Sequence, residues 1–409
     1  MRIVDPDALP AALPGLPASP RVVTSGNFAT PRTALAALDA GIETYRLNLL
    51  NAQVPLPDRD GVIWETSFVG AAMRRSPRLA YVPTRLSLVP DLWRTTLPPD
   101  VVVVHTSTPR GGQVSLGIEV NVLPSAIEAV RARGGVLIAQ MNPRMPFTRG
   151  DGVLDVDDVD LAVEVDEPLA SPPPIPLDDT AAAIGAAVAG RVPDGATVQL
   201  GIGAVPDAVL HGLRSRRGLR VWSEMFSDGV LALDAEGALD TDATITASFA
   251  FGSAELYRWI DGNDRVQMLR TEVVNEPARI ARNPRMVSVN TALQVDLFAQ
   301  ANASRIGSRI FSGFGGQTDF IVGALHSPGG QAIMALRSWH PKADVSTIVP
   351  LVDEPVTSFQ PTAVVTEQGV ADVFGHDERT QAAHLIEQAA HPRVRDELWE
   401  EAAALGLLG

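Results

Sequence analysis

Short apolar runs recur along the chain, and polar residues, glycine or proline bound each of them. Runs of this kind are typical of buried strands. We predict strands at residues 101–106, 136–141, 219–223, 286–290, 309–312 and 362–366. Segments with helical apolar spacing lie between or after them, at residues 124–133, 253–260, 276–283 and 377–404. Because strands and helices alternate, the pattern predicts an α/β fold with largely parallel sheets covered by helices.

An internal repeat indicates that this arrangement occurs twice. Residues 21–38 and 196–213 each contain a β-branched run followed by a glycine, Gly26 in the first copy and Gly201 in the second. A proline follows in both copies, and leucines recur at matching offsets. This order is typical of a strand, a glycine loop and a helix with proline in its first turn. The repeat predicts two similar α/β domains, with coincidental similarity as the alternative.

The predicted domains meet at a proline-rich stretch. A chain of 409 residues is too long for one ordinary core. The sequence SPPPIP at residues 171–176 cannot lie inside a helix or a central strand, so it predicts a stiff linker. We therefore predict one domain over residues 1–170 and a second over residues 177–409, whose first helix is capped within residues 178–180.

The composition limits the cellular location of the protein and the chemistry that it can carry out. No apolar run approaches the roughly 18–20 residues of a membrane helix, and prolines interrupt the N-terminal segment where a signal peptide is continuously apolar. The chain has no cysteine, which excludes disulfides, a thiolate nucleophile and cysteine-bound metals. We expect a cytoplasmic protein that does not contact the membrane.

The net charge and the small number of lysines and histidines exclude further classes of partner and of active site. The formal net charge of −15 disfavours nucleic acid and anionic membranes as partners. Lys342 is the single lysine, and the chain has no Walker A loop. No two histidines are four residues apart, so the commonest helical zinc spacing is missing and no metal site is expected. Carboxylates remain the best available nucleophiles.

Two glutamates follow predicted strands. Glu224 comes directly after residues 219–223, and ligands of parallel α/β sheets bind beyond the carboxyl ends of the strands. A solvated or capping residue is the alternative reading of Glu224, and we interpret residues 227–229 as a turn. Glu367 follows residues 362–366, with a buried hydrogen-bonding role as its alternative.

Two glycine clusters are candidate binding loops. Gly201 and Gly203 lie between a predicted strand and a predicted helix, where backbone N–H groups form an anion or oxyanion site or simply a tight turn. Residues 311–320 contain three glycines that allow the backbone to approach a ligand closely. Asp319 in that segment is a candidate for orienting the loop or contacting the ligand, and a plain loop is the alternative.

Longer motifs follow one another along nearly the whole chain. They are STPRGGQVSLGIEV (107–120), NPRMPFTRGD (142–151), LGIGAVPDAVL (200–210), SEMFSDGV (223–230), SFAFGSAELYRWID (248–261), VNEPARIARNPRMVSVNTALQVDL (274–297), FSGFGGQTDFIVGA (311–324), VVTEQGVADVFG (364–375) and AAHPRVRDEL (389–398). The series resembles the acetyl-CoA hydrolase/transferase family, which includes 4-hydroxybutyrate CoA-transferase-like enzymes within the class I CoA-transferases.

The resemblance implies two open α/β domains with the active site between them. The site residues that it implies are Glu224 as the catalytic glutamate, Gly201 and Gly203 in the oxyanion site, Gly313, Gly315, Gly316 and Gln317 in the CoA-binding loop, and Asn275 near CoA. Acyl-CoA and short carboxylates are the implied substrates, and no permanently bound cofactor is implied. Family analogy further implies a homodimer or a larger homo-oligomer.

The chain also departs from the family pattern. Trp222 stands where a histidine is frequent, and Phe374 stands where an arginine follows the second carboxylate. Residues 335–344 keep only part of the usual motif, and Ala299 replaces a common glycine. None of these changes removes the candidate nucleophile, but they leave the acyl group and the CoA contacts open.

The resemblance leads to one hypothesis for function and two alternatives. The hypothesis is transfer of CoA from a short-chain acyl-CoA to a free carboxylate of the acetate, butyrate or 4-hydroxybutyrate type, through a glutamyl-CoA thioester. Hydrolysis of acyl-CoA by the same glutamate is the first alternative, because the two reactions differ only in whether water reaches the intermediate. A non-catalytic CoA-binding paralogue is the second.

Overall fold

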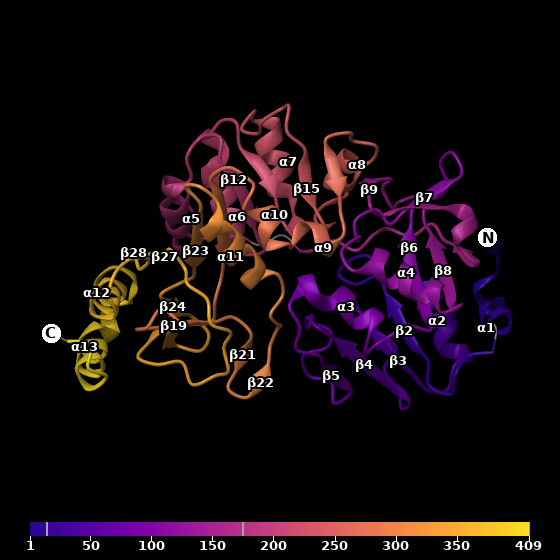
Figure 1. The fold of residues 1–409 in the computed structure, drawn as a ribbon, viewed down its shortest axis with the longest axis horizontal. Coiled ribbons are helices and arrows are strands. Elements are labelled where there is room, and N and C mark those ends of the chain that lie inside the picture. Colours follow the sequence, from indigo (N-terminus) through magenta and orange to yellow (C-terminus); the bar gives the residue numbers. More distant parts are fainter. Residues whose placement is uncertain (14, 174–175, 409) are drawn as a thin grey trace. The chain divides into compact units, whose positions relative to one another are not determined.

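The computed structural model describes residues 1–13, 15–173 and 176–408 and divides into two compact units (Figure 1). Unit 1 comprises Met1–Pro172 and Thr244–Val274, and unit 2 comprises Pro173–Ala243 and Asn275–Gly409. Each unit is therefore built from two segments, whereas the ranges expected from the sequence were continuous. The predicted linker at 171–176 includes residues 174 and 175, which lie outside the described residues.

The main sheet of unit 1 is parallel throughout. Its strands are β1 (Arg2–Ile3), β2 (Arg21–Thr24), β3 (Tyr45–Asn48), β4 (Val62–Thr66), β5 (Leu79–Tyr81), β6 (Val101–Thr106), β8 (Val136–Met141) and β11 (Leu161–Glu164). Their spatial order is β1-β11-β8-β6-β2-β3-β4-β5. Every residue of β6 and β8 is buried, which explains why both strands read as unbroken apolar runs.

Helices and smaller strands complete unit 1. The helices are α1 (Leu9–Ala12), α2 (Arg32–Gly41), α3 (Val89–Arg94), α4 (Leu123–Ala132), α8 (Ala254–Ile260) and α9 (Thr271–Val274). The smaller strands are β7 (Gln113–Ser115), β9 (Arg149–Gly150), β10 (Val153–Asp155), β15 (Ile245–Ala247), β16 (Phe249–Ala250) and β17 (Val266–Met268). β17 pairs with both β9 and β15, so residues 244–274 pack with the first segment of the chain. In Figure 1, α2 and α4 lie beside the strands of this unit.

Unit 2 repeats the parallel arrangement. Its main strands are β12 (Thr197–Leu200), β13 (Arg220–Trp222), β18 (Met286–Asn290), β23 (Gln331–Ala335), β27 (Ala363–Thr366) and β28 (Gly369–Asp372). They lie in the order β28-β27-β23-β18-β12-β13, and only β28 runs antiparallel to its neighbour. The helices are α5 (Asp179–Arg191), α6 (Ala204–Gly212), α7 (Asp228–Ala235), α10 (Pro277–Ile280), α11 (Gln317–His326), α12 (Glu378–His384) and α13 (Arg395–Ala404).

Short strands lie in the loops that connect the main elements of unit 2. They are β14 (Met225–Phe226), β19 (Gln294–Asp296), β20 (Ala301–Asn302), β21 (Arg305–Ile306), β22 (Arg309–Ile310), β24 (Trp339–His340), β25 (Val345–Ser346) and β26 (Ile348–Val349). β21 pairs with β22 and β24 pairs with β25, each in an antiparallel hairpin.

The strand order reverses once in each main sheet. In unit 1 the chain moves outward from β2 through β3 to β5, and then returns to place β6 on the other side of β2. In unit 2 it moves from β12 to β13 and then places β18 on the other side of β12. Open parallel sheets bind ligands at such reversal points, beyond the carboxyl ends of the strands. Each unit therefore has one favoured binding edge.

The predicted α/β class and parallel sheets are confirmed, and most predicted elements are present. β6, β8 and β18 have the predicted bounds, and Asp178 caps α5 by accepting a hydrogen bond from the Ala181 N–H. The C-terminal helical segment is interrupted next to Pro392, as predicted: Ala390 and His391 are extended, and a 3-10 helix at Pro392–Val394 then leads into α13. The helices of the described residues include none that is both long and apolar enough to cross a bilayer.

Two local predictions were wrong. Residues 227–229 do not form an isolated turn, because α7 begins at Asp228 with Ser227 as its N-cap residue. Serine followed by aspartate suits a helix start as well as a turn, and the sequence signal does not distinguish them. The strand predicted at 309–312 is only the two-residue β22 of a hairpin.

Candidate active site

Glu224 lies between β13 and β14 at the carboxyl edge of the unit 2 sheet. The preceding residue, Ser223, donates a hydrogen bond from Oγ to the Leu200 carbonyl oxygen at 3.2 Å. Leu200 is the last residue of β12. This bond joins the ends of the two strands, so the glutamate is held next to the β12–α6 loop at the reversal point of the sheet.

Two hydrogen-bond donors contact the Glu224 carboxylate. Asn275 donates from Nδ2 to Oε2 at 3.0 Å, and the backbone N–H of Gly316 donates to the same carboxylate. Asn275 is fully buried between α9 and α10, and its Oδ1 has no hydrogen-bond partner among the described residues. The structure therefore brings together three predicted residues that are far apart in the sequence.

Gly316 is in contact with Glu224 only because it lacks a side chain. A Cβ at this position would lie 1.9 Å from Oε2 of Glu224 and 2.2 Å from Nδ2 of Asn275. The backbone of Gly316 has φ −95°, which any residue adopts. Glycine is therefore required here for the close approach of the backbone to the carboxylate, and backbone conformation does not require it.

Burial raises the pKa of Glu224 to about 7. The hydrogen bonds from Asn275 and Gly316 favour the charged form, while the negative charge of Asp319 disfavours it. The residue keeps a partly exposed surface, but its carboxyl group is enclosed by protein atoms. Near pH 7 the carboxylate is therefore about half ionised and weakly solvated, which suits a nucleophile.

The β12–α6 loop carries Gly201 and Gly203. Gly203 has φ 115°, a conformation that L side chains rarely adopt, and a Cβ there would meet open space. Ile202 between them has 42% of its surface exposed. The loop precedes α6, whose N-terminus favours negative charge. Its oxyanion role stays a prediction, since the contacts that reach Glu224 come from Asn275 and Gly316.

The glycine loop before α11 borders a small pocket. Gly315 takes a left-handed conformation at φ 55°, and Gln317 at the start of α11 donates from Nε2 toward the Thr291 carbonyl oxygen at 3.4 Å. The pocket, of about 20 Å³, has room for one or two waters. Its lining residues are Ala301, Ala303, Ser304, Gly313, Phe314, Gln317, Thr318, Val356, Thr357 and Phe359.

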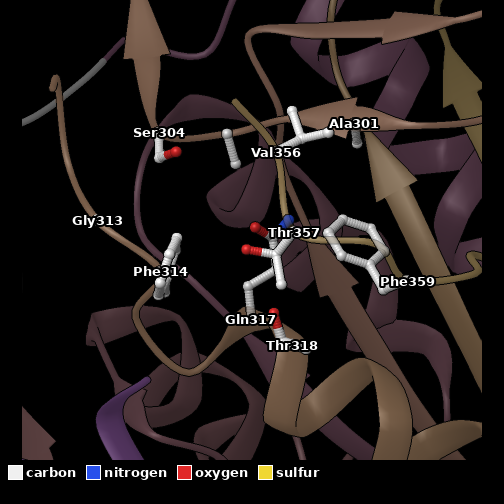
Figure 2. Close-up of a pocket in the computed structure, with 10 residues that line it drawn as sticks. Ala301, Ser304, Gly313, Phe314, Gln317, Thr318, Val356, Thr357 and Phe359 are labelled. Carbon is white, nitrogen blue, oxygen red and sulfur yellow. The ribbon is translucent and has the colours of Figure 1, made fainter. Parts of the chain in front are cut away.

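Figure 2 shows how this pocket is arranged. The side chains of Thr357 and Gln317 lie next to each other, between the rings of Phe314 and Phe359. The glycine loop thus presents Gly316 to Glu224, while Gly313 and Gln317 line the pocket. A contact of Gly313, Gly315 or Gln317 with CoA stays a prediction.

The second carboxylate, Glu367, has a different environment. Burial alone would raise its pKa, but hydrogen bonds from the Ser338 side chain and backbone, with Gln368, hold the pKa below its ordinary value. Glu367 is therefore ionised, and its carboxylate oxygens already accept hydrogen bonds from Ser338 and Gln368. The buried hydrogen-bonding reading of this residue agrees with these contacts better than a nucleophilic one.

Sequence reasoning missed the effects of two residues. Ser338 donates hydrogen bonds from its backbone N–H and its side chain to Glu367, and it lies in the stretch 335–344 that keeps only part of the family pattern. Asp319 was expected to orient the loop or contact the ligand, and its buried charge also raises the pKa of Glu224. The position of Asp319 three residues after Gly316 was a usable signal, but its distance from Glu224 depends on the tertiary fold.

Two departures from the family pattern lie near these elements. Trp222 ends β13 two residues before Glu224 and is half-buried. Phe374 follows β28 and has 57% of its surface exposed. Across the ranges 1–13, 15–173 and 176–408, no group of three or more histidine, aspartate or glutamate side chains could hold a metal ion.

Comparison with known proteins decides the family. The model of the acetyl-CoA hydrolase/transferase C-terminal domain matches residues 252–402. A 4-hydroxybutyrate coenzyme A transferase from Clostridium kluyveri is 39% identical over 349 residues, which cover 82% of this chain and 80% of the relative. This chain belongs to the acetyl-CoA hydrolase/transferase family.

Other members of the acetyl-CoA hydrolase/transferase family agree. The crystal structure of a 4-hydroxybutyrate CoA-transferase from Porphyromonas gingivalis matches with a TM-score of 0.80 at 30% identity, covering 99% of this chain and 98% of that one. An acetyl-CoA hydrolase from Kluyveromyces lactis is more distant, with 33% identity over 50% of this chain and 40% of the relative. The predictions of an enzyme and of this family are confirmed.

Proposed function

We propose that the protein transfers CoA from a short-chain acyl-CoA to a free carboxylate through a covalent intermediate on Glu224. The observation that carries the proposal is the environment of that carboxylate. It lies at the reversal point of a parallel sheet, burial raises its pKa to about 7, and two N–H donors contact it. These properties support a role as nucleophile.

The first half-reaction forms two covalent species in turn. An oxygen of ionised Glu224 attacks the thioester carbonyl carbon, the carbon–sulfur bond breaks, and CoA leaves as the thiolate. The product is a mixed anhydride between the acyl group and Glu224. The thiolate then attacks the carbonyl carbon of Glu224, the donor acid leaves as a carboxylate, and a glutamyl-CoA thioester remains. The acceptor carboxylate takes CoA by the same steps in reverse.

The two donors to Glu224 have a specific use in the second step. When the thiolate attacks the carbon of Glu224, one carboxyl oxygen of that residue becomes the oxyanion. Gly316 and Asn275 already donate to this carboxyl group, so they need no rearrangement to stabilise the charge. Gly201 and Gly203 are the proposed donors for the other oxyanion, which forms on the acyl carbon in the first step.

Hydrolysis and CoA binding without catalysis are the competing functions. If water took the place of the acceptor carboxylate, the enzyme would be an acyl-CoA hydrolase. The similarity to an acetyl-CoA hydrolase supports this alternative. Trp222 and Phe374 motivate a non-catalytic paralogue, although the groups that donate hydrogen bonds to Glu224 are those of Asn275 and Gly316. Cytoplasmic location and assembly as a homodimer stay predictions from composition and family resemblance.

Acceptor dependence tests the proposed transfer. Loss of acetyl-CoA is expected to accelerate at least tenfold when 4-hydroxybutyrate, butyrate, propionate or succinate is added, with the new acyl-CoA appearing in equal amount. Liquid chromatography of the CoA species measures both quantities. Equal rates with and without every acid, together with free CoA as the product, would establish hydrolysis instead. No turnover of any thioester would leave the non-catalytic reading.

The pH dependence of kcat/KM tests the state of Glu224. The attacking form is the carboxylate, and a pKa of about 7 leaves about a tenth of the molecules ionised at pH 6 and about nine-tenths at pH 8. We expect kcat/KM to rise about tenfold over that interval. Replacing Asp319 with asparagine removes a negative charge beside Glu224, so the rise should move to lower pH. A profile that is flat from pH 6 to 8 would contradict the proposed nucleophile.

A further inference from the structure

Three polar residues on β12 and β18 of unit 2 form a cluster that the proposed mechanism does not use. Gln199 of β12 is paired with Ser288 of β18, and Asn290 is the last residue of β18. Their side chains lie on one face of the sheet, because paired residues of neighbouring strands share a face, as do residues two apart in a strand. The strand order reverses between β12 and β18. The polar cluster therefore lies at the favoured binding edge of unit 2.

Three hydrogen bonds join the polar cluster. Ser288 donates from Oγ to Oε1 of Gln199 at 2.6 Å. Asn290 donates from Nδ2 to Oγ of Ser288 at 2.8 Å and to Oε1 of Gln199 at 3.3 Å. These bonds use the carbonyl oxygen of Gln199 and the NH₂ group of Asn290. Within the part of the chain that the structure describes, Nε2 of Gln199 and Oδ1 of Asn290 have no hydrogen-bond partner.

The unused N–H groups of Gln199 are exceptional for a buried side chain. Gln199 has only 5% of its surface exposed, and buried side-chain donors are mostly hydrogen-bonded. Its Nε2 is not one of the fully enclosed atoms that lack a partner among the described residues, so the exposed surface of Gln199 includes this atom. Valine or isoleucine would suit a buried strand at least as well. The cluster thus presents a donor and, on half-buried Asn290, an acceptor that a ligand can reach.

The orientation of the two amides does not affect this conclusion. A serine hydroxyl both donates and accepts, so turning both amides over would reverse all three bonds together. The free NH₂ group would then be on Asn290 and the free carbonyl oxygen on Gln199. In either arrangement the polar cluster presents one NH₂ group and one carbonyl oxygen.

Contacts within unit 2 connect the polar cluster to Glu224 from two sides. The residue before Glu224 donates a hydrogen bond to the carbonyl oxygen of Leu200, which follows Gln199 in β12. Gln317 comes directly after the glycine whose N–H donates to Glu224. Nε2 of Gln317 lies 3.4 Å from the carbonyl oxygen of the residue that follows Asn290. The cluster is therefore a close neighbour of the candidate nucleophile.

Gln317 and the polar cluster also share one face of the sheet. Nε2 of Gln317 lies 3.5 Å from Sδ of Met334. Met334 of β23 is paired with Asn290 of β18, so these two side chains project from the same face. Gln317 also lines the pocket in Figure 2. A single ligand at the carboxyl edge of unit 2 can therefore contact both Glu224 and the cluster.

We propose that Gln199 and Asn290 bind an amide group of the pantetheine arm of CoA. The inference rests on the proposed function for the identity of the ligand as a CoA thioester. The pantetheine arm carries amides a short carbon link away from its sulfur, and this sulfur must reach Glu224 in the proposed transfer. An amide has one carbonyl oxygen and one N–H, which match the donor of Gln199 and the acceptor of Asn290.

The other parts of the substrates fit the polar cluster less well. A carboxylate only accepts hydrogen bonds, so it would face the carbonyl oxygen of Asn290 with no proton between them. An alkyl chain would leave the amides of Gln199 and Asn290 without partners in a water-poor position, which is unfavourable. The cluster therefore favours a neutral ligand group that both donates and accepts.

Binding of CoA itself tests the inference without turnover. Gln199→Met keeps the length of the side chain and removes the donor, and Asn290→Leu keeps the shape and removes the acceptor. We expect each change to raise the Kd of CoA about tenfold, the usual effect of losing one buried hydrogen bond. The nucleotide 3′-phosphoadenosine 5′-diphosphate is CoA without the pantetheine arm, and its Kd should be the same in the wild type and both variants. Isothermal titration calorimetry measures all these values.

Gln331→Met is the matched control. Gln331 is the first residue of β23 in the same sheet, and it exchanges hydrogen bonds with Arg191. The change therefore removes the same type of side chain from the opposite, amino end of a strand. It should leave the Kd of CoA within twofold of the wild-type value. A general loss of folding would weaken the binding of CoA and of the nucleotide alike.

Two results would overturn the inference. One is a Kd of CoA within twofold of the wild-type value in either folded variant, and the other is an equal loss of affinity for CoA and for the nucleotide. Absence of CoA binding to the wild type would contradict the proposed function, on which the inference rests. Absent turnover with intact CoA binding would contradict only the role of Glu224, because the affinities are measured without turnover.

Discussion

Replacing Glu224 with glutamine is expected to lower acyl-CoA turnover by at least about 10⁴-fold, the usual effect of removing a covalent nucleophile. The amide has the shape of the carboxyl group but cannot form the anhydride. Incubation of the unchanged enzyme with acetyl-CoA should add the mass of CoA, less water, to the peptide that contains Glu224. The glutamine variant should show no such adduct by mass spectrometry.

The same substitution is expected to increase stability at high pH. Folding raises the pKa of Glu224 from 4.5 to about 7, so the ionised form is less favourable in the folded than in the unfolded chain. Below pH 4.5 both states are protonated and the carboxyl group causes no loss of stability. As pH rises through 7 the loss grows to about 3 kcal/mol, and glutamine avoids it. Urea unfolding at pH 5 and pH 8 measures the difference.

Glu400 provides the matched control. It is an exposed glutamate on α13, and Glu400→Gln should leave turnover unchanged and change the free energy of unfolding by no more than about 0.5 kcal/mol. Glu224→Gln turnover above about a hundredth of the original rate would contradict the nucleophilic role. A large loss of stability at pH 8 would indicate instead that Glu224 holds the fold together.

Replacing Gly316 with alanine is expected to lower kcat by about 10²–10³-fold, the effect of losing an oxyanion donor or displacing a reacting group. The added methyl group would lie 1.9 Å from Oε2 of Glu224, so either the carboxylate or the loop must move. Either movement breaks the hydrogen bond from the Gly316 N–H. The backbone of Gly316 suits alanine, so the effect should arise from this contact and leave folding intact.

Gly190→Ala is the control for the glycine substitution. Gly190 lies within α5 of the same unit, and a Cβ there meets open space. It should leave kcat unchanged and increase stability by about 0.5–1 kcal/mol. Steady-state kinetics and thermal unfolding of both variants measure these effects. If Gly316→Ala keeps its rate within threefold, the loop does not position Glu224.

Much of the fold was predictable because burial leaves a local pattern. β6 and β8 are enclosed on both faces, so their sequences are continuously apolar and their bounds were confirmed. The conformation of residues 227–229 was not predictable, because a serine, an aspartate and a glycine suit either a turn or a helix start. The contact that constrains Gly229 is tertiary, with a Cβ there lying 2.3 Å from Cδ1 of Leu210.

The boundaries of the compact units also depend on tertiary contacts that a local sequence pattern does not contain. The proline-rich stretch at 171–176 is a local signal for a linker, and the linker stays a prediction. The assignment of residues 244–274 to unit 1 depends on the pairing of β17 with β9, which joins segments far apart in the chain. No feature of residues 244–274 alone records this pairing.

The sequence by itself determined the α/β class, the repeated strand–glycine–helix unit, the family and the choice of Glu224 as the candidate nucleophile. These depend on periodicity and on motifs, which are properties of short segments. Only the tertiary structure decided that Asn275 and Gly316 contact that carboxylate and that burial raises its pKa to about 7. Only the tertiary structure showed that the side-chain amides of Asn27 and Asn121 in unit 1 donate hydrogen bonds to Glu119. Solvation and hydrogen bonding depend on which distant segments meet, so only the folded chain determines them.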